Sequence, residues 1–332
     1  MTTESELLDQ INGELAPGID WKAGARTYVQ SLYAKHGAGY IDRHALTKPF
    51  NEIPSSVNYQ AYITEATHYL ANFTNAVALL NLPGGSLILD PGCGGGWISH
   101  SLRRMGYRTF GFDLCADFIT LARRRLAEDA ALSFSLFEIE SMFQVHDAEA
   151  QPLPVEMRET FDAAIIESCL HHFWNPVTAL RHIGETIKPD GILVCIEGEN
   201  RQGSIKQEYM AVMREYHTLE RPYPRELLCD ALRLAGFDHV EFVAPLHGWY
   251  SPNDPTASQF VEIHRQLAAG MNLAICAKTE SALQRLFPWR AERPASAATV
   301  NTNTTSRSPS PETSRVLPQW LRRMIPDLRG EP

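Results

Sequence analysis

The chain has 332 residues, 44% of them hydrophobic and 21% charged, which excludes a wholly disordered, collagen-like or coiled-coil protein. Its 30 basic and 39 acidic residues give a net charge of -9, which repels phosphate backbones, so no nucleic acid partner is expected. No stretch reaches the roughly 18 apolar residues that span a bilayer, and the acidic, polar start has no secretory pattern. We therefore predict a cytoplasmic protein without stable membrane insertion.

The first 80 residues favour helix and are expected to form an N-terminal helical cap that contributes to substrate binding. The segment Tyr59–Leu80 carries apolar side chains at helical spacing. Before it lies a stretch of aromatic and histidine side chains, which either forms a lid over a substrate or only packs the helices onto the rest of the protein. Its members are Tyr28, Tyr33, His36, Tyr40 and His44.

From residue 86 to about residue 279, short apolar runs alternate with amphipathic stretches, which is typical of βαβ units around a parallel sheet. We predict an α/β fold with seven strands and helices on both faces of the sheet. Two helices are especially clear, one from Asn175-Pro176 to Pro189 and one from Pro224 to Ala235. The strands are expected at 87–90, 108–113, near 134–143, 161–167, 192–197, 240–245 and 271–278.

The six cysteines show no metal-binding pattern, because no two of them form a CxxC pair. Most lie inside apolar runs, where a thiol packs as a small hydrophobic group. We expect all six to be reduced and predict no metal site. They are Cys93, Cys115, Cys169, Cys195, Cys229 and Cys276.

The end of the chain has a different composition. Ten of the 21 residues from 294 to 314 are Ser or Thr, so we expect a disordered linker over 288–315, after a core domain over 81–287 and the cap over 1–80. Residues 316–332 predict a short amphipathic helix. Seven basic and four acidic residues give segment 290–332 a charge of +3, so this tail either docks weakly on a protein or an anionic membrane surface or touches nothing.

The strongest functional pattern is a buried strand that runs into a glycine loop at Asp90-Pro91-Gly92-Cys93-Gly94-Gly95-Gly96. Such a loop lets backbone approach a ligand closely and presents the amides of a helix N-terminus. Asp113 follows 21 residues after Gly92, at the end of the next strand, where a carboxylate can accept hydrogen bonds from both ribose hydroxyls. Loop and acid together predict a cofactor that contains a nucleoside.

The spacing of the glycines narrows the choice of cofactor. A dinucleotide fingerprint needs a glycine at the sixth position, which here is Trp97, and no Walker phosphate loop is present. Instead, Asp90-x-Gly92-x-Gly94-x-Gly96 resembles the first motif of class I S-adenosylmethionine-dependent methyltransferases.

The resemblance continues over roughly residues 86–200. Residues 111–114 resemble the end of the second strand of that family, 161–172 its fourth strand and following loop, and 187–191 its L-K-P-G-G turn. The last two expected strands fit its reversed final hairpin, so the resemblance implies a Rossmann-like, seven-stranded methyltransferase sheet. Gly96-Trp97 and Lys48-Pro49-Phe50 are similar to bacterial enzymes associated with polysaccharide and small-molecule biosynthesis.

The resemblance also implies a role for individual residues with S-adenosyl-L-methionine as the cofactor. The loop residues Asp90, Gly92, Cys93, Gly94 and Gly96 would hold the methionine end, Asp113 and Leu114 the ribose, and Glu167 would lie at the edge that faces the acceptor. For the adenine, Asp147 with Ala148 is favoured and Glu138 is the alternative, because two alignments of the third strand compete.

Methyl transfer needs collinear alignment more than a special catalytic group, but a hydroxyl acceptor benefits from a general base. His171 and His172, just after the fourth strand, are candidate catalytic bases, or they only cap the loop. Glu197, Glu199 and the segment 247–250 are further candidates for acceptor contacts.

We predict methyl transfer to an oxygen or nitrogen of a small-molecule or glycan-type acceptor. The alternatives are a catalytically inactive, methyltransferase-like scaffold, or another nucleoside-cofactor enzyme that performs aminopropyl transfer or NAD-linked redox chemistry.

Overall fold

The computed structural model describes residues 2–13, 15, 19–37, 39, 59–198, 207–243 and 271–292. Residues Met1–Arg290 form one compact unit and Ala291–Pro332 a second. The predicted tail helix, most of the predicted linker, Tyr40, His44, Glu199 and the segment 247–250 lie outside the described residues. Among the described helices, none is long and apolar enough to cross a membrane.

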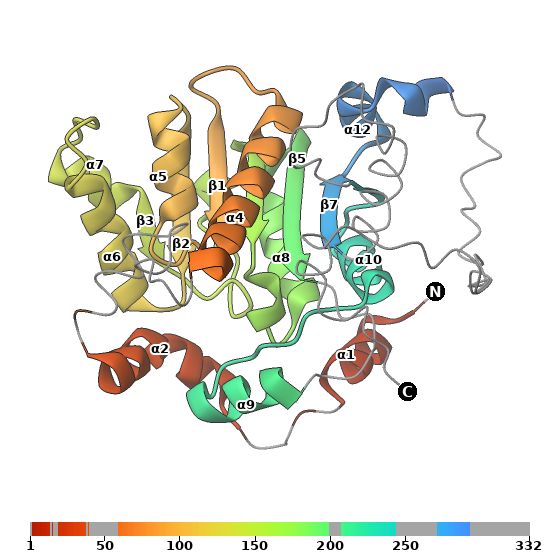
Figure 1. The fold of residues 1–332 in the computed structure, drawn as a ribbon. Helices are drawn as coiled ribbons and strands as arrows, with labels where there is room; N and C mark the ends of the chain where they lie inside the picture. Colours follow the sequence, from red (N-terminus) through yellow and green to blue (C-terminus); the bar gives the residue numbers. More distant parts are fainter. Residues whose placement is uncertain are drawn as a thin grey trace, which may run out of the picture. The chain divides into compact units, whose positions relative to one another are not determined.

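One seven-stranded sheet organises the first unit, as predicted (Figure 1). Its order is β3-β2-β1-β4-β5-β7-β6, and only β7 runs antiparallel to its neighbours β5 and β6. The chain leaves β1 toward β2 and β3 and then returns to β4, so the strand order reverses beside β1, and open α/β sheets bind ligands at the carboxyl ends of strands at such a point. The strands are β1 (Leu87–Pro91), β2 (Arg108–Asp113), β3 (Phe143–Val145), β4 (Phe161–Glu167), β5 (Ile187–Gly198), β6 (His239–Phe242) and β7 (Met271–Ala277).

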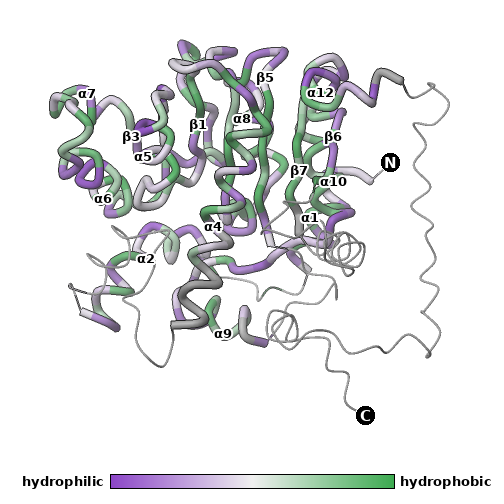
Figure 2. Tube along the Cα trace, turned by 45° about the horizontal axis from the view of Figure 1, so that its top comes forward, coloured by the Kyte–Doolittle hydropathy of each residue, from purple (hydrophilic) through white to green (hydrophobic). Residues whose placement is uncertain are grey.

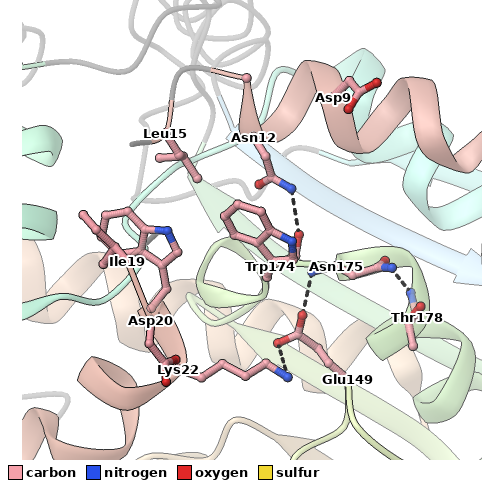
Figure 3. A pocket seen from close by; sticks show the side chains of 12 residues that line it. Asp9, Asn12, Leu15, Ile19, Asp20, Lys22, Glu149, Trp174, Asn175 and Thr178 are labelled. Carbon is pink, nitrogen blue, oxygen red and sulfur yellow. Dashed lines mark hydrogen bonds and ion pairs between the residues drawn. The ribbon is translucent and has the colours of Figure 1, made fainter. Parts of the chain in front are cut away.

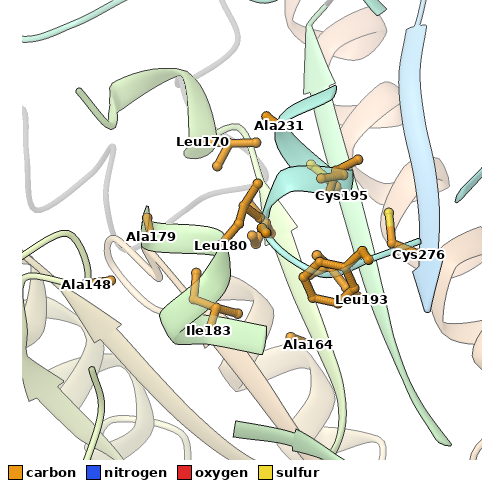
Figure 4. Packing of buried hydrophobic residues seen from close by; sticks show 14 of the residues in the cluster. Ala148, Ala164, Leu170, Ala179, Leu180, Ile183, Leu193, Cys195, Ala231 and Cys276 are labelled. Carbon is orange, nitrogen blue, oxygen red and sulfur yellow. The ribbon is translucent and has the colours of Figure 1, made fainter. Parts of the chain in front are cut away.

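Helices cover both faces of the sheet because its central strands are apolar on both sides (Figure 2). On one face, Leu180 and Ile183 of α8 (Pro176–Thr186) pack with Leu193 of β5, beside α10 (Arg225–Leu234) and α1 (Glu4–Asn12) (Figure 4). On the other face lie α4 (Tyr59–Leu80), α5 (Trp97–Arg104) and α12 (Glu280–Leu286). The two helices predicted most clearly begin after Asn175 and Pro224, which are their N-caps.

The region before β3 differs from the prediction. Ser135 and Glu138 form a capping box, in which each side chain bonds the backbone N–H of the other residue, and this starts the helix α7 (Leu136–Ser141). The strand expected near 134–143 is therefore wrong over most of its length, and β3 begins only at Phe143. Of the two competing alignments, this start of β3 agrees with the one that places Asp147 just after the strand.

Two helices, α2 (Trp21–His36) and α9 (Gln207–Tyr216), lie together across one end of the sheet (Figure 1). This is the carboxyl edge, because Lys22 of α2 bonds Asp147 just after β3. The ring of Tyr28 packs between Phe118 of α6 (Ala116–Ala127) and Tyr216 of α9, with centroids 6.2 and 5.3 Å away. Tyr28 thus joins helices together, one of the two roles considered for the aromatic stretch. Single 3-10 turns complete the described elements, namely η1 (Val155–Met157), η2 (Leu170–His172) and η3 (Pro288–Glu292).

Candidate functional site

The glycine loop after β1 has a backbone that only glycine adopts easily. Gly92, Gly94 and Gly96 have φ angles of 65°, 49° and 73°, in the left-handed region. A Cβ on Gly92 would lie 1.9 Å from Sγ of Cys169, and one on Gly96 would lie 2.7 Å from Cβ of Ala122. Two of the glycines therefore allow close packing within the protein. A Cβ on Gly94 would meet nothing within 4 Å, so this glycine leaves open space beside the loop.

Asp90 lies within β1 and caps the following helix. Its Oδ2 accepts hydrogen bonds from the backbone N–H (3.0 Å) and the hydroxyl (2.7 Å) of Ser99, in the first turn of α5. This carboxylate takes the place of a side-chain cap that the left-handed Gly96 cannot supply. Asp90 is only 2% exposed, and its burial, with the nearby charges of Glu167 and Asp113, raises its pKa to about 7.

Asp113 joins the end of β2 to the glycine loop. Its Oδ2 accepts from the N–H of Gly94 at 3.0 Å, and its Oδ1 accepts from the N–H of Cys115 at 2.8 Å. Burial raises the pKa of this carboxyl to about 6 even though the backbone donors oppose the shift. Leu114 lies between these contacts, directly after β2.

Two other groups support the loop. Cys93 is buried and its raised pKa, which results first from burial, makes it a packing thiol and no nucleophile. Arg125 of α6 donates from Nε to the carbonyl of Gly95 at 2.9 Å. Sequence reasoning missed Arg125, although its spacing from Ala122 places it on the buried face of α6 and marks it as a charge that needs a partner.

Glu167 ends β4, the strand beside β1. Its Oε1 accepts from the hydroxyl of Ser168 at 2.7 Å, and Ser168 itself has a left-handed φ of 51°. Three adjacent strands, β2, β1 and β4, thus carry Asp113, Asp90 and Glu167 toward one region. Each of the other two carboxylates raises the pKa of Asp90, so a positive charge bound among them would be favourable.

These residues fit S-adenosyl-L-methionine. The open side of Gly94 gives a ligand access to the backbone, and the neighbouring carboxylates suit a cofactor that carries a positive sulfur. The acid at the end of β2 lies where a ribose is held in nucleoside-binding α/β folds.

Asp147 lies two residues after β3 and is already paired with a cation. Lys22 of α2 contacts both of its carboxylate oxygens at 3.0 Å, and Arg26 approaches to 3.7 Å. Although burial alone would raise its pKa, the bonds to Lys22 and to backbone amides lower it. Ala148 is buried, and its carbonyl accepts from Nδ1 of His182 at 2.6 Å. The alternative acid, Glu138, is an exposed capping residue of α7.

The two candidate catalytic histidines lie in the 3-10 turn after β4, and His171 is bound by two carboxylates. Its Nδ1 lies 2.6 Å from Oε2 of Glu197, and its Nε2 lies 3.2 Å from Oε1 of Glu220. Burial lowers the pKa of His171, but the two carboxylates outweigh burial and raise it to about 10. This arrangement favours a charged, positioning imidazole over a general base.

Glu197 has a different role from the acceptor contact expected of it. It is buried, and its Oε1 accepts from the N–H groups of Cys169 (2.9 Å) and Leu170 (2.6 Å). Glu197 therefore holds the loop that carries both histidines and is neither a solvated acid nor free for an acceptor. His172 donates from Nδ1 to the carbonyl of Leu219, and burial together with the charge of His171 lowers its pKa to about 4.

A separate pocket of about 780 Å³ lies between the N-terminal helices and the start of α8 (Figure 3). Trp174 stands at its centre, with Lys22 and Glu149 paired on one side and Asn12 bonded to the carbonyl of Trp174. None of the predicted site residues lines this pocket, so it is not the cofactor site described above.

The central part of the chain is similar in sequence to known methyltransferases. Residues 89–195 match a family described as "Methyltransferase domain". The chain is 30% identical over 111 residues to the ubiquinone biosynthesis O-methyltransferase of Xanthomonas axonopodis pv. citri (strain 306). The aligned region covers 33% of this chain and 42% of that protein. For the enzyme of the same name from Hydrogenovibrio crunogenus, identity is 30% over 105 residues, with 31% and 39% covered. The chain thus spans about two fifths of the length of these relatives.

One solved structure supports the fold. A geranyl diphosphate methyltransferase in complex with GPP and sinefungin superimposes with a TM-score of 0.51 at 13% sequence identity, and the match covers 78% of this chain and 98% of that chain. The likeness in fold therefore covers more of the chain than residues 89–195.

Proposed function

We propose that the protein is an S-adenosylmethionine-dependent methyltransferase that transfers a methyl group to an oxygen or nitrogen of a small-molecule or glycan-type acceptor. The match of residues 89–195 to a methyltransferase domain supports this proposal. The observation that carries this proposal is the bond between Asp113 and the N–H of Gly94, which brings the ribose acid and the glycine loop into one site. The oxygen acceptor is favoured, because the matching relatives are named O-methyltransferases.

The chain's own residues bind and align the reactants. When bound, S-adenosylmethionine supplies an electrophilic methyl group on a positively charged sulfur. In this proposal, Asp90 and the glycine loop would hold its methionine end, Asp113 its ribose and Asp147 its adenine. A dry, fixed arrangement of this kind contributes to the rate chiefly by orientation.

The acceptor side of the site is formed, in this proposal, by Glu167 and the loop that carries His171 and His172. Helices α2 and α9 cover this edge, since Leu219, just after α9, accepts from His172, and Lys22 of α2 holds Asp147. The N-terminal helices would therefore control which acceptors enter and exclude water.

Calorimetric titration with S-adenosylmethionine, S-adenosylhomocysteine and NAD tests the cofactor. We expect one molecule of either sulfur compound to bind per chain, NAD not to bind, and Asp113→Ala to weaken binding at least tenfold. Asp117→Ala is the matched control, because Asp117 is an acid on α6 that accepts an exposed hydrogen bond from Gln30. Failure of both sulfur compounds to bind the folded protein would favour the inactive scaffold.

Turnover is tested separately. Formation of S-adenosylhomocysteine with any hydroxyl- or amine-bearing acceptor, at a rate above the acceptor-free background, would exclude both the scaffold and aminopropyl transfer. Hydroxyl-bearing acceptors should be screened first and amines second, because the matching relatives are named O-methyltransferases.

A further inference from the structure

Three side chains beside the proposed acceptor region form a cluster with the composition of a metal site. They are His171, His172 and Glu220, and each offers one ligand atom that lies within 4.8 Å of the other two. His171 is buried, whereas His172 and Glu220 are half-buried, so the cluster can be reached from one side. Two histidines and one carboxylate are a common ligand set for zinc and for ferrous iron when further positions remain open.

Each histidine is oriented as metal-bound histidines are. The Nδ1 of His171 is bonded to the carboxylate of Glu197, and the Nδ1 of His172 donates to the backbone carbonyl of Leu219. A carboxylate or carbonyl acceptor on one ring nitrogen fixes the ring and leaves the other nitrogen as the ligand. In both rings the remaining nitrogen is Nε2, and that of His171 lies 3.2 Å from Oε1 of Glu220.

The two loops that supply the ligands are fastened to each other. Tyr223 donates from its hydroxyl to the carbonyl of Leu170 at 3.0 Å, and the buried guanidinium of Arg221 donates to the carbonyls of Phe173 and Trp174. These bonds flank Glu220 on one loop and the histidine pair on the other. The site is therefore held in place before any ligand arrives, which lowers the cost of binding.

We infer that His171, His172 and Glu220 bind a divalent transition-metal ion through both Nε2 atoms and a glutamate oxygen. Zinc is the cation that this donor set suits best, and the ion keeps at least one coordination position for an oxygen ligand. This proposal differs from our expectation of no metal site, which rested on the cysteines alone. The pattern that would have revealed it, a His-His pair and a glutamate 48 residues later, has no characteristic spacing.

A proton is the competing occupant, since a protonated His171 would also bridge Glu197 and Glu220. That alternative explains the two glutamates and leaves His172 only its bond to the carbonyl of Leu219, although its ring lies beside that of His171, tilted by 49° at a centroid distance of 4.2 Å. A second imidazole beside a charged one is unfavourable, whereas two imidazoles beside a metal are both used. If a metal ion is the occupant, loss of His172 should weaken cobalt binding. If a proton is the occupant, the chain should bind no cobalt, with or without His172.

The cation would also act in the proposed reaction, and this part rests on the proposed function. A hydroxyl bound to the open position loses its proton more readily than a free hydroxyl. Oxygen acceptors that can coordinate a metal, such as catechols, would then be preferred over simple amines.

Cobalt(II) is the probe for the site, because its visible absorption reports the ligands. The whole chain is stripped with a chelator and titrated with cobalt(II) and then with zinc. We expect one cobalt ion per chain, displacement by zinc, and at least tenfold weaker binding in both His172→Ala and Glu220→Gln. His239→Ala is the control, because His239 is a partly exposed histidine paired with Glu280 outside the cluster.

Folding of each variant is checked by circular dichroism and by titration with S-adenosylhomocysteine. If the folded wild-type chain binds no cobalt, or if both variants bind it as tightly as the wild type, the metal site is refuted. Binding of S-adenosylhomocysteine without cobalt would refute only the metal site, and binding of cobalt without S-adenosylhomocysteine would refute only the proposed function.

Discussion

Buried carboxylates have different bonding partners in the two halves of the sheet's carboxyl edge. Beside β1 and β2, the carboxylates of Asp90 and Asp113 accept bonds from a hydroxyl and from backbone amides, and no cation neutralises them among the bonds described. Beside β4 and β5, Glu197 and Glu220 face the imidazole of His171. The carboxyl groups of the first half have raised pKa values and no cationic side chain among their described bonds, whereas those of the second half are paired with an imidazole.

The difference indicates which half of the edge can gain free energy by binding a positively charged ligand. The charge of a bound sulfonium compensates the acids of the first half, so their unfavourable burial becomes favourable on binding. In the second half, the same kind of group serves to hold a loop in place. Substitutions in the second half should therefore cost stability, and substitutions in the first half should cost binding.

The largest effect is expected for Glu197→Ala in the second half. This change would leave two backbone N–H groups without their acceptor and a buried imidazole without its main charge partner. Breaking a buried pair in this way typically costs about 3–5 kcal/mol. Urea denaturation should show that loss in the free energy of unfolding.

Glu197→Gln is the matched variant, because its amide oxygen can still accept from Cys169 and Leu170. We expect it to lose less than half as much stability as Glu197→Ala. Equal losses in the two variants would mean that charge balance, and not the backbone bonds, dominates this half of the edge.

The glycine loop provides the next largest contrast. Gly92→Ala combines a left-handed backbone, at about 1–2 kcal/mol, with a clash against Cys169, so we expect about 2–4 kcal/mol of destabilisation in total. Gly94→Ala meets no neighbouring atom and should cost only the left-handed backbone term of about 1–2 kcal/mol. The order should reverse for the cofactor: Gly94→Ala should abolish binding of S-adenosylhomocysteine in a protein that still folds.

The comparison also predicts a pH dependence for Asp90. Its pKa is about 7 in the folded protein and 3.8 ordinarily, so its contribution to stability is fully present below pH 3.8 and is lost as the pH rises through 7. Asparagine does not titrate and keeps an oxygen for Ser99. Asp90→Asn should therefore match the wild type near pH 4 and exceed its stability by about 4 kcal/mol near pH 8.

The same variant should bind S-adenosylmethionine more weakly, because it removes a negative charge from the methionine end. Thermal unfolding from pH 4 to 8 and calorimetry at pH 8 measure the two effects. A variant that is less stable than the wild type at pH 8 would show that the ionised carboxylate stabilises the ligand-free protein.

The sequence predicted best those features that depend on residues close together in the chain. Strand β2 has the expected bounds and β1 extends one residue further, because apolar runs that end in Gly, Pro or Asp depend on nearby residues alone. The strand expected near 134–143 failed because Ser135 and Glu138 favour a helix start. Strand β5 begins at Ile187, before the predicted turn, with an irregular register opposite Phe161.

The residues of the site also fall into a predictable group and an unpredictable group. Asp90, Asp113 and the glycines form one region because short loops connect adjacent strands. The roles of Arg125, Glu197 and Glu220 depend on contacts across 26 or more residues, and their residue types have many other uses, so no local pattern distinguishes them.

The smallest effect concerns Lys22, the cation that α2 places on Asp147 and Glu149. The Lys22 side chain is 29% exposed, so Lys22→Met should cost only about 0.5–1 kcal/mol at neutral pH. The Asp147 pKa is lowered in the folded state, so the stability from this pair is present above the ordinary pKa and is lost as the pH falls through the folded value. The difference between variant and wild type should therefore narrow below about pH 4.

Arg26→Met is the control, since Arg26 lies 3.7 Å from the same carboxylate and is half exposed; it should change stability by less than Lys22→Met at every pH. The two variants also test the adenine assignment. Removal of Lys22 frees the Asp147 carboxylate, so S-adenosylhomocysteine should bind as tightly as before or tighter, whereas Asp147→Ala should bind it more weakly. If Asp147→Ala binds the cofactor normally, the ion pair with Lys22 is the whole role of Asp147, and this part of the edge resembles the charge-balanced half beside β4 and β5.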